Sequence, residues 1–456
     1  MKFTSSFVFL LALLLSSHAN VSAAVKRSHR STTATAKASQ PTSKNVTVAA
    51  STSAKMVFAH FMVGIVSSYQ AGDWANDIAL ASASGIDGFA LNIGADSYTE
   101  TQLTLAYNAA ASKSFKLFIS FDMTSISDPN RISSILKQYS GQSAQFKVDG
   151  KPFVSTFVGY GVVDWNSIQA SSGVSIYLVP NWQASQLQGN TQVSGGFSWI
   201  AWPNSNNQPI DANMTTDSDN AYTSALAGKA YMAPVSPWFF THFGSDVSYS
   251  KNWLFLSDVL WYQRWEQILK LKPDFVEIIT WNDFGESHYI GPLHPENPSV
   301  YAGPATDGAK SWVENMPHDG WRDISQAYIT AYKNGASSPV VTKDEIVYYY
   351  RLMPKDTTCS SDSTGPPTGR DYVDDKVYAV TLLKSPGTLT VTSGGNPPVQ
   401  FSAPSGVTIW SVPMGVGSQQ FKLTRNGATV LSGTGSQQIK NSCTIYNFNA
   451  FVGTVV

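Results

Sequence analysis

Between residues 56 and 333, short apolar runs alternate with stretches of helical periodicity. The runs are rich in β-branched and aromatic residues and are continuously apolar, which is typical of strands buried on both faces. Such strands, each followed by a helix, predict a parallel sheet. We expect strands at residues 57–63, 88–94, 118–122, 152–157, 176–182, 196–202, 231–238 and 275–281, and helices at 74–84, 99–112, 130–139, 261–271 and 323–333.

About eight strand–helix units over roughly 280 residues indicate a (β/α)8 TIM barrel, which we place at residues 55–338. Asp73 is positioned to cap the first expected helix. An open doubly wound sheet is the alternative fold. That fold normally carries a Gly-rich phosphate-binding turn early in the chain, and this sequence has no such turn there.

Helical periodicity ends near residue 339, and short strand-like runs then alternate with Gly, Pro, Ser and Asn. This texture predicts a small all-β, sandwich-like domain at residues 339–456. Arg425-Asn426-Gly427 is a hairpin signal within it. We expect strands at 346–351, 376–383, 388–392, 407–412, 421–424 and 444–448.

The sequence contains two cysteines, Cys359 and Cys443, and both lie in this last part of the chain. In an oxidising compartment a bridge between them is expected, and two separate buried thiols are the alternative. Neither cysteine has a metal-ligand partner at useful spacing, so we expect no metal site.

The first 23 residues have the pattern of a secretory signal peptide. Lys2 supplies the positive charge, residues 7–15 form an apolar core too short to span a bilayer, and residues 21–23 offer a small-residue cleavage site. Residues 24–54 are rich in Ser, Thr, Ala and Lys, which predicts a disordered segment, and Lys26-Arg27 is a candidate processing site. N-glycosylation sequons at Asn45 and Asn213 agree with secretion. We therefore expect a secreted protein, extracellular or in a cell wall, without membrane contact once the signal is removed.

The charge balance argues against a polyanionic partner. The net charge is −1 and no basic stripe is present, so nucleic-acid binding is not expected. Charged residues make up 13% of the chain and aromatic residues 12%. Few charges and many flat rings suit a neutral, polyhydroxylated ligand, although a large aromatic core explains the same composition.

The end of the eighth expected strand carries the densest cluster of polar groups, Trp281 to Tyr289. In a TIM barrel, functional side chains gather at the carboxyl ends of the strands. Asp283 and Glu286 are two carboxylates three residues apart, and Gly285 between them permits a tight turn. Glycoside hydrolysis uses two carboxyl groups, and this spacing allows either the inverting or the retaining separation. A solvated acidic loop, or a helix capped by Asp283, is the non-catalytic alternative.

Other residues near strand ends are candidate sugar ligands. Some would hydrogen-bond hydroxyl groups and others would stack on sugar rings. For each, the alternative is a satisfied buried polar group or a core aromatic residue. The candidates are His60, Asn92, Asp122, Trp182, Trp202, Trp238, Trp281, Asn282, His288 and Tyr289.

Three separated segments resemble glycoside hydrolase family 71, the fungal α-1,3-glucanases or mutanases. They are residues 57–64, 233–239 and 277–289, in the order the family has them. The similarity covers about residues 55–340, and the all-β tail resembles the accessory domain of the family. The resemblance implies cleavage of internal bonds of α-1,3-glucan with inversion of configuration. It maps the catalytic pair onto Asp283 and Glu286. Within that pair, we assign Glu286 as general acid and Asp283 as general base.

The resemblance implies no cofactor, because hydrolysis needs only water and two carboxyl groups. We expect a monomer whose all-β domain either binds glycan or braces the barrel, and we favour bracing. Two other classes of function stay open on the sequence. One is a non-catalytic glycan-binding barrel, and the other is a related barrel hydrolase acting on α-mannan or β-glucan.

Overall fold

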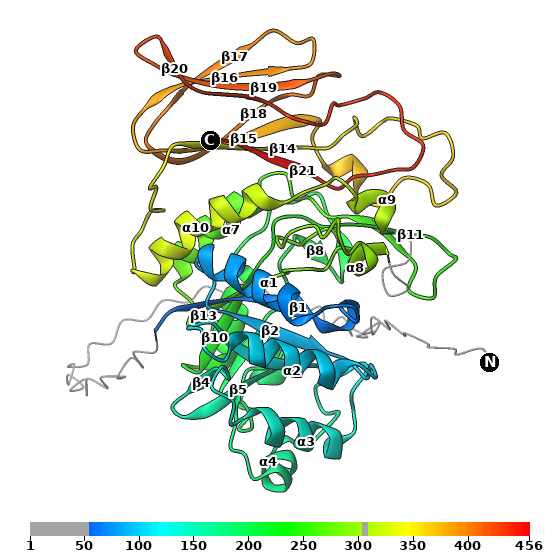
Figure 1. Ribbon diagram of the computed structural model, residues 1–456, viewed down its shortest axis with the longest axis vertical. Coiled ribbons are helices and arrows are strands. Elements are labelled where there is room, and N and C mark those ends of the chain that lie inside the picture. The colour runs from blue at the N-terminus through cyan, green and yellow to red at the C-terminus, as the bar shows by residue number, and fades with distance from the viewer. Residues whose placement is uncertain (1–53, 303–308) are drawn as a thin grey trace, which may run out of the picture.

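The computed structural model describes residues 54–302 and 309–456. The expected signal peptide, Lys26-Arg27 and the Asn45 sequon lie outside the described residues. Figure 1 shows an α/β part below and an all-β part above it. Among the described residues, none of the helices has the length and apolar character needed to cross a bilayer.

The α/β part is built on one curled sheet of nine strands in the order β4-β5-β3-β2-β1-β13-β10-β7, with β6 paired to β5. Every pairing in it is parallel except β4–β5. Two further backbone hydrogen bonds, from Ser194 N to Leu178 O (2.9 Å) and from Phe197 N to Pro180 O (3.0 Å), link the β6 and β7 segments. The strands are β1 (Met56–Met62), β2 (Gly88–Ile93), β3 (Lys116–Asp122), β4 (Lys147–Val148), β5 (Lys151–Phe157), β6 (Tyr177–Leu178), β7 (Gly195–Phe197), β10 (Ala230–Val235) and β13 (Phe275–Ile278).

The eight apolar runs of the sequence all supply strands of this sheet, but the fifth to eighth strands are shorter than expected. β6 ends at Leu178, ahead of Pro180, which has no N–H to donate to a ladder. β13 ends at Ile278, so Trp281 lies on the loop that follows it.

Helices cover the outer face of the sheet. The longer ones are α1 (Ala71–Ala83), α2 (Thr99–Ala110), α3 (Pro129–Tyr139), α4 (Trp165–Ser172), α6 (Asp217–Leu226), α7 (Leu260–Leu271) and α10 (Asp319–Lys333). Short helices are α5 (Ala184–Leu187), α8 (Ser299–Ala302), α9 (Lys310–Val313) and the 3-10 turns η1 (Val63–Ile65) and η3 (Arg370–Tyr372). Two small hairpins, β8 (Asn204–Ser205) with β9 (Gln208–Pro209) and β11 (Phe240–Phe243) with β12 (Lys251–Leu254), project from the strand ends.

The first helix starts earlier than predicted, and its cap is Gln70 instead of Asp73. The Asp73 carboxylate accepts the Gln70 backbone N–H at 2.7 Å, and Gln70 reciprocates, so the two residues form a capping box. For α3, Asp128 caps the helix through the Asn130 N–H and Pro129 occupies the first turn.

The interior of the sheet is filled by aromatic rings. Phe58 packs edge-on against Phe118 with ring centroids 4.9 Å apart, and Phe153 lies 4.6 Å from Phe118 and 5.4 Å from Phe275. All four are at most 1% exposed. Because the other faces of these strands pack against helices, both faces are buried, which explains the continuous apolar runs.

The all-β part consists of two four-stranded antiparallel sheets, β18-β15-β14-β21 and β17-β16-β19-β20. The Tyr348 and Phe421 rings stack between them with centroids 4.3 Å apart. At the β19–β20 turn, Asn426 (φ 49°) and Gly427 (φ 79°) take the left-handed conformation that the hairpin signal predicts. The strands are β14 (Glu345–Tyr350), β15 (Lys376–Leu383), β16 (Gly387–Ser393), β17 (Val399–Ala403), β18 (Gly406–Pro413), β19 (Gln419–Arg425), β20 (Ala428–Thr434) and β21 (Phe451–Val455).

The predicted strand at residues 444–448 is wrong. This segment is a loop whose rings Tyr446 and Phe448 pack towards His242 and Phe240 of β11, and the last strand begins at Phe451. Cys443, just before this loop, forms a disulfide with Cys359 across a Cα–Cα distance of 4.6 Å.

The two parts share buried contacts. The β14 and β21 strands lie against α10 (Figure 1), where the Trp321 and Tyr349 rings are 5.9 Å apart. The Tyr349 hydroxyl donates to Asp258 O at 2.6 Å, and the Trp238 indole donates to Phe448 O at 3.0 Å. The all-β part therefore braces the α/β part through specific hydrogen bonds as well as packing.

A buried ion pair joins α6 and α7. Arg264 donates to both carboxylate oxygens of Asp219 at 2.8 and 2.6 Å, and neither side chain is more than 1% exposed. We predict that Arg264→Met lowers the free energy of unfolding by about 3–5 kcal/mol, because it leaves a buried carboxylate without its cation. Chemical denaturation measures the loss. Arg131→Met, which breaks an exposed pair with Glu100, is the control and costs at most about 1 kcal/mol; equal losses in the two variants would contradict the prediction.

Candidate active site

The loop that follows β13 brings Asp283, Glu286 and His288 together. His288 Nε2 lies 2.9 Å from Glu286 Oε2 and 3.7 Å from Asp283 Oδ2. The Glu286 N–H donates to Asp283 Oδ1 at 3.1 Å. The Asp283 side chain is 20% exposed and the Glu286 side chain 17%, whereas the His288 side chain is buried. Both carboxylates are therefore partly open to solvent, and the imidazole that they contact is not.

Hydrogen bonds to the strand β1 set the position of this loop. Trp281 N donates to His60 O at 2.7 Å, and the Asn282 side chain accepts from Met62 N at 2.7 Å and donates to Met62 O. Asn282, expected to bind substrate, is 1% exposed and ties the loop to the end of β1. The loop therefore starts from a fixed point beside β1.

The backbone of Ser287 and the hydroxyl of Thr280 orient the acidic groups of this loop. Ser287 takes the left-handed conformation (φ 58°), whereas Gly285 does not, so the turn depends on Ser287 and not on the predicted glycine. A Cβ on Gly285 would lie 3.1 Å from Phe243 Cζ, so glycine here makes room for that ring. Thr280 Oγ1 accepts the Asp283 N–H at 2.7 Å and lies 3.1 Å from His288 Nδ1.

The sequence reasoning missed Lys251. This residue on β12 places Nζ against Glu286 Oε1, and its side chain is 15% exposed. Glu286 thus lies between a lysine ammonium group and the imidazole of His288. Lys251 lies 35 residues before Glu286 in the sequence, and a separation of this size does not indicate a contact.

The surroundings drive the two carboxyl pKa values apart. Burial alone would raise the pKa of Glu286, but the Lys251 charge and the His288 hydrogen bond outweigh it and lower that pKa to about 2. Burial raises the pKa of Asp283, and the neighbouring Glu286 charge adds to the rise against the opposing charges of His288 and Lys251. Such a split is the arrangement in which one carboxyl group stays protonated while its neighbour is ionised.

Among the other polar candidates, His60 and Asp122 have partners in the fold. His60 Nδ1 lies 2.7 Å from Glu277 Oε1 with both side chains buried, and its ring meets Trp199 at 4.8 Å. Asp122 accepts from the Thr124 N–H and hydroxyl. Asn92 is 6% exposed at the end of β2.

The aromatic candidates divide into two groups. Trp238, Trp281 and Tyr289 are at most 2% exposed in the core, and Tyr289 donates its hydroxyl to Met316 O, so these rings are covered by the fold. Trp202 and Trp182 are also buried, each 4% exposed, but they lie beside other features of interest. Trp202 is 5.1 Å from the His288 ring, and Trp182 packs edge-on against Tyr160, which is 50% exposed. Trp199 and Tyr160 were not among the sequence candidates.

Comparison with known proteins shows the family. The family model for glycosyl hydrolase family 71 matches residues 53–456. The chain belongs to this family. It is 48% identical over 407 residues to a mutanase of Penicillium rubens, with 88% of each chain covered. It is 42% identical over 422 residues to the glucan endo-1,3-alpha-glucosidase agn1 of Schizosaccharomyces pombe, covering 88% of this chain and 95% of the relative. It is 32% identical over 429 residues to the ascus wall endo-1,3-alpha-glucanase of the same yeast, covering 87% and 96%.

The carboxylate cluster of this family 71 chain has the geometry for a cation, since ligand atoms of Asp283, Glu286 and His288 lie within 4.8 Å of one another. Lys251 already supplies a positive charge to Glu286 from the chain itself.

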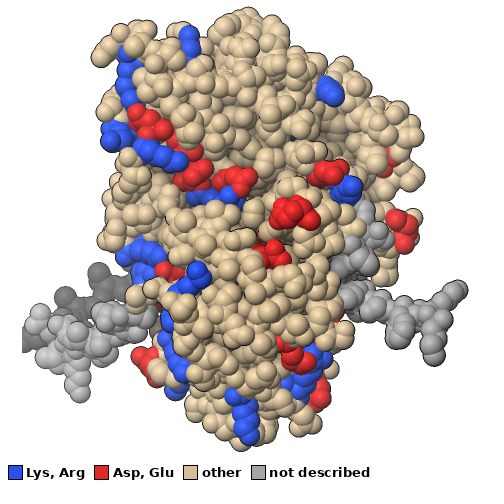
Figure 2. Space-filling view, in the orientation of Figure 1, with Lys and Arg blue, Asp and Glu red and all other residues tan. Residues whose placement is uncertain are grey.

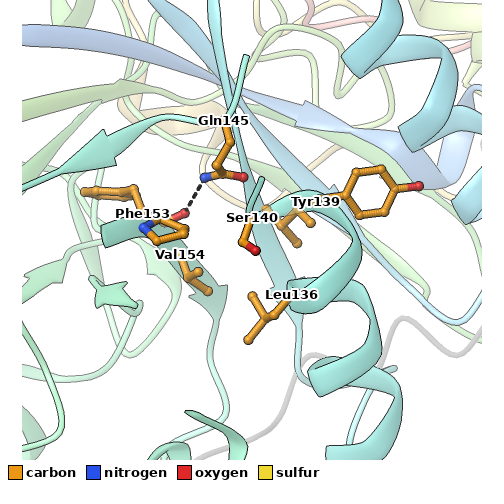
Figure 3. A pocket seen from close by; sticks show the side chains of 8 residues that line it. Leu136, Tyr139, Ser140, Gln145, Phe153 and Val154 are labelled. Atoms are coloured by element: carbon orange, nitrogen blue, oxygen red, sulfur yellow. Dashed lines mark hydrogen bonds between the residues drawn. The ribbon is translucent and has the colours of Figure 1, made fainter. Parts of the chain in front are cut away.

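A pocket in this family 71 chain lies between α3, β3 and β5 (Figure 3), and neither Asp283 nor Glu286 is among the residues that line it. Its lining is mostly apolar, and Gln145 donates to the Phe153 carbonyl at 3.1 Å inside it. Its polar groups are engaged within the fold, so this pocket belongs to the packing of α3 on the sheet.

The Thr280 hydroxyl provides a test of how the loop that carries Asp283 and Glu286 is held. Thr280→Val leaves the Asp283 N–H without its acceptor, and we predict a loss of about 1–3 kcal/mol in the free energy of unfolding. Thr280→Ser keeps the hydroxyl and loses one methyl group, so it costs about 1 kcal/mol. Chemical denaturation of both variants measures the difference, and an equal loss in both would show that the hydroxyl is not the anchor.

Proposed function

We propose that this protein is a secreted, endo-acting glycoside hydrolase that cleaves α-1,3-glucosidic bonds within α-1,3-glucan. The observation that carries the proposal is the Asp283–Glu286 pair, two partly exposed carboxylates at one loop with pKa values driven in opposite directions. Family membership and relatives named mutanase and endo-1,3-alpha-glucosidase support the choice of substrate.

In the mechanism we propose, Asp283 is the general acid and Glu286 the general base. Protonated Asp283 gives its proton to the bridging oxygen as the C1–O bond breaks, and ionised Glu286 takes a proton from the water that attacks C1. This reverses the order that we assigned from the sequence. The reversal is supported by the Lys251 and His288 contacts, which favour the charged form of Glu286.

We propose inversion of configuration, as the resemblance implies. Oxygens of Asp283 and Glu286 lie within 4.8 Å of each other, closer than the roughly 6.5–9.5 Å of inverting pairs. Inversion therefore requires the carboxyl groups to separate by roughly 2 Å when substrate and water enter. NMR of the first-formed anomer from α-1,3-glucan decides this point, because inversion releases the β-anomer.

We further propose that the curled sheet is a closed (β/α)8 barrel at residues 55–338, followed by an accessory all-β domain at 339–456. The two hydrogen bonds between the β6 and β7 segments support closure, because they join the ends of the sheet path. At the carboxyl ends of its strands we propose that His60, Asn92, Asp122, Trp182 and Trp202 contribute to substrate binding. We propose a monomer without nucleic-acid or membrane partners, secreted to the extracellular space or cell wall.

Surface character supports a neutral polymer as substrate. Figure 2 shows that uncharged residues cover most of the displayed face, with acidic and basic groups scattered over it. Asn213 is exposed, which fits its proposed glycosylation in a secreted protein. Release of reducing ends from insoluble α-1,3-glucan, with α-mannan and β-glucan assayed beside it, separates this function from a binding protein and from a hydrolase of another glycan.

Two isosteric variants test the catalytic pair. We predict that Asp283→Asn and Glu286→Gln each lower the hydrolysis rate by at least about 10²-fold, because each removes one proton transfer. Glu286→Gln should regain turnover when azide is added, because azide attacks C1 without a base, and the product should be a β-glycosyl azide. Asp283→Asn should regain turnover on an α-linked oligosaccharyl fluoride, because fluoride leaves without a proton. Reducing-end assays and mass spectrometry measure both outcomes.

Glu314→Gln, at an exposed i,i+4 pair with Lys310, is the matched carboxyl-to-amide control and should keep normal turnover. Azide rescue of Asp283→Asn instead of Glu286→Gln would restore the order assigned from the sequence, with Glu286 as the acid. Normal turnover in either catalytic variant would remove that residue from the mechanism.

A further inference from the structure

We infer that Lys251 is a positioning residue for the catalytic pair, and that the all-β part fixes it there through the contact between His242 and Asp362. The inference rests on the proposed function, since it concerns the same two carboxylates. It assigns the all-β part a direct influence on hydrolysis rather than on glycan binding.

The β11–β12 hairpin contacts the catalytic loop at three points. Lys251 Nζ meets Glu286 Oε1, and the Phe240 N–H donates to Glu286 O at 3.1 Å. Phe243, the cross-strand neighbour of Lys251, lies under Gly285. The hairpin therefore contacts the segment that carries Glu286 through a backbone hydrogen bond, an aromatic ring and a charged side chain.

The other side of the hairpin is attached to the all-β part. His242 Nδ1 lies 2.8 Å from Asn252 Oδ1, and His242 Nε2 lies 2.8 Å from Asp362 Oδ2. The side chains of His242 and Asp362 are 3% and 4% exposed. Asn252 is the residue next to Lys251, and its amide donates to Gly365 O at 2.9 Å. Backbone hydrogen bonds of 2.9 Å join Asn252 O to Thr368 N and Thr368 O to Leu254 N.

Asp362 is itself firmly placed. Its Oδ1 accepts the Thr364 N–H at 3.0 Å and its Oδ2 accepts the Tyr446 N–H at 2.7 Å. The Ser360 N–H donates to Cys443 O at 2.9 Å beside the Cys359–Cys443 disulfide. The segment held by the Cys359–Cys443 disulfide therefore contains Asp362, and Asp362 contacts His242 on the hairpin that carries Lys251.

The charges around Glu286 fix the direction of the expected effect. Glu286 faces Lys251 from β12, and Asp283 and His288 from its own loop. The Lys251 charge favours the ionised form of both carboxyl groups. Removing that charge raises the pKa of both, so both limbs of the pH–rate profile move to higher pH whichever residue is the acid.

The experiment is the pH–rate profile of the full chain on α-1,3-glucan. For Lys251→Met we expect both limbs to rise by about one pH unit or more, and for Lys251→Arg we expect a profile close to the wild type. Asp362→Asn should shift the limbs in the same direction by a smaller amount. Asp362→Asn added to Lys251→Met should give no further shift, because the two substitutions act through one contact.

Two matched controls use ion pairs away from the hairpin. Lys333→Met breaks a pair with Asp87 (2.5 Å), and Asp344→Asn breaks one with Arg425 inside the all-β part (2.5 Å); neither should move the profile. Thermal unfolding of each variant identifies any that fail to fold, and Lys251→Gln then replaces Lys251→Met.

The outcomes separate the two proposals. A wild-type protein that leaves α-1,3-glucan intact contradicts the proposed function, whereas an active wild type whose profile is unchanged in folded Lys251→Met overturns only the role of Lys251. An Asp362→Asn shift of equal size with and without Lys251 overturns the role of the all-β part.

Discussion

The attachment of the loop after β13 to the end of β1 is the constraint on which the proposed chemistry depends. The Trp281 N–H and the Asn282 side chain bond to the backbone of His60 and Met62, so the loop leaves the sheet in one direction only. Two carboxylates three residues apart then share one imidazole. A loop without that attachment would place Asp283 and Glu286 in solvent, where their pKa values would be alike.

The two parts of the chain have unequal roles in this arrangement. The α/β part supplies both carboxylates and the imidazole, whereas the all-β part supports the hairpin that brings the ammonium group. Its buried contacts with α10 and with Trp238 hold it against the α/β part.

Much of the fold could be predicted from the sequence because strands buried on two faces leave continuous apolar runs. All eight runs supply strands of the main sheet, although β6, β7, β10 and β13 end early. The edge strand β20 escaped prediction because most of its residues are exposed and small, so it has no apolar pattern. Residues 444–448 were wrongly predicted as a strand for the opposite reason. Tyr446 and Phe448 are buried by tertiary packing, although this segment belongs to no sheet.

For the site, the sequence identified Asp283, Glu286 and His288 because they lie close together in the chain. Lys251 could not be found in this way, since a hairpin outside the strand–helix alternation delivers it. Trp281 and Tyr289 were predicted to stack on sugar rings because they follow the last strand, but their rings are buried in the core. Local spacing therefore predicts the groups on one loop, and long-range pairing decides which charges surround them.

The pairing of segments far apart in the chain also has a consequence for biosynthesis. Trp238 donates to the carbonyl of Phe448, His318 lies 3.0 Å from Asn449 Oδ1, and β14 is paired along its length with β21 at Phe451–Val455. During translation, these contacts can form only after residues 448–455 have been synthesised. The α10 face and the strand β14 therefore gain their last partners at the end of chain synthesis.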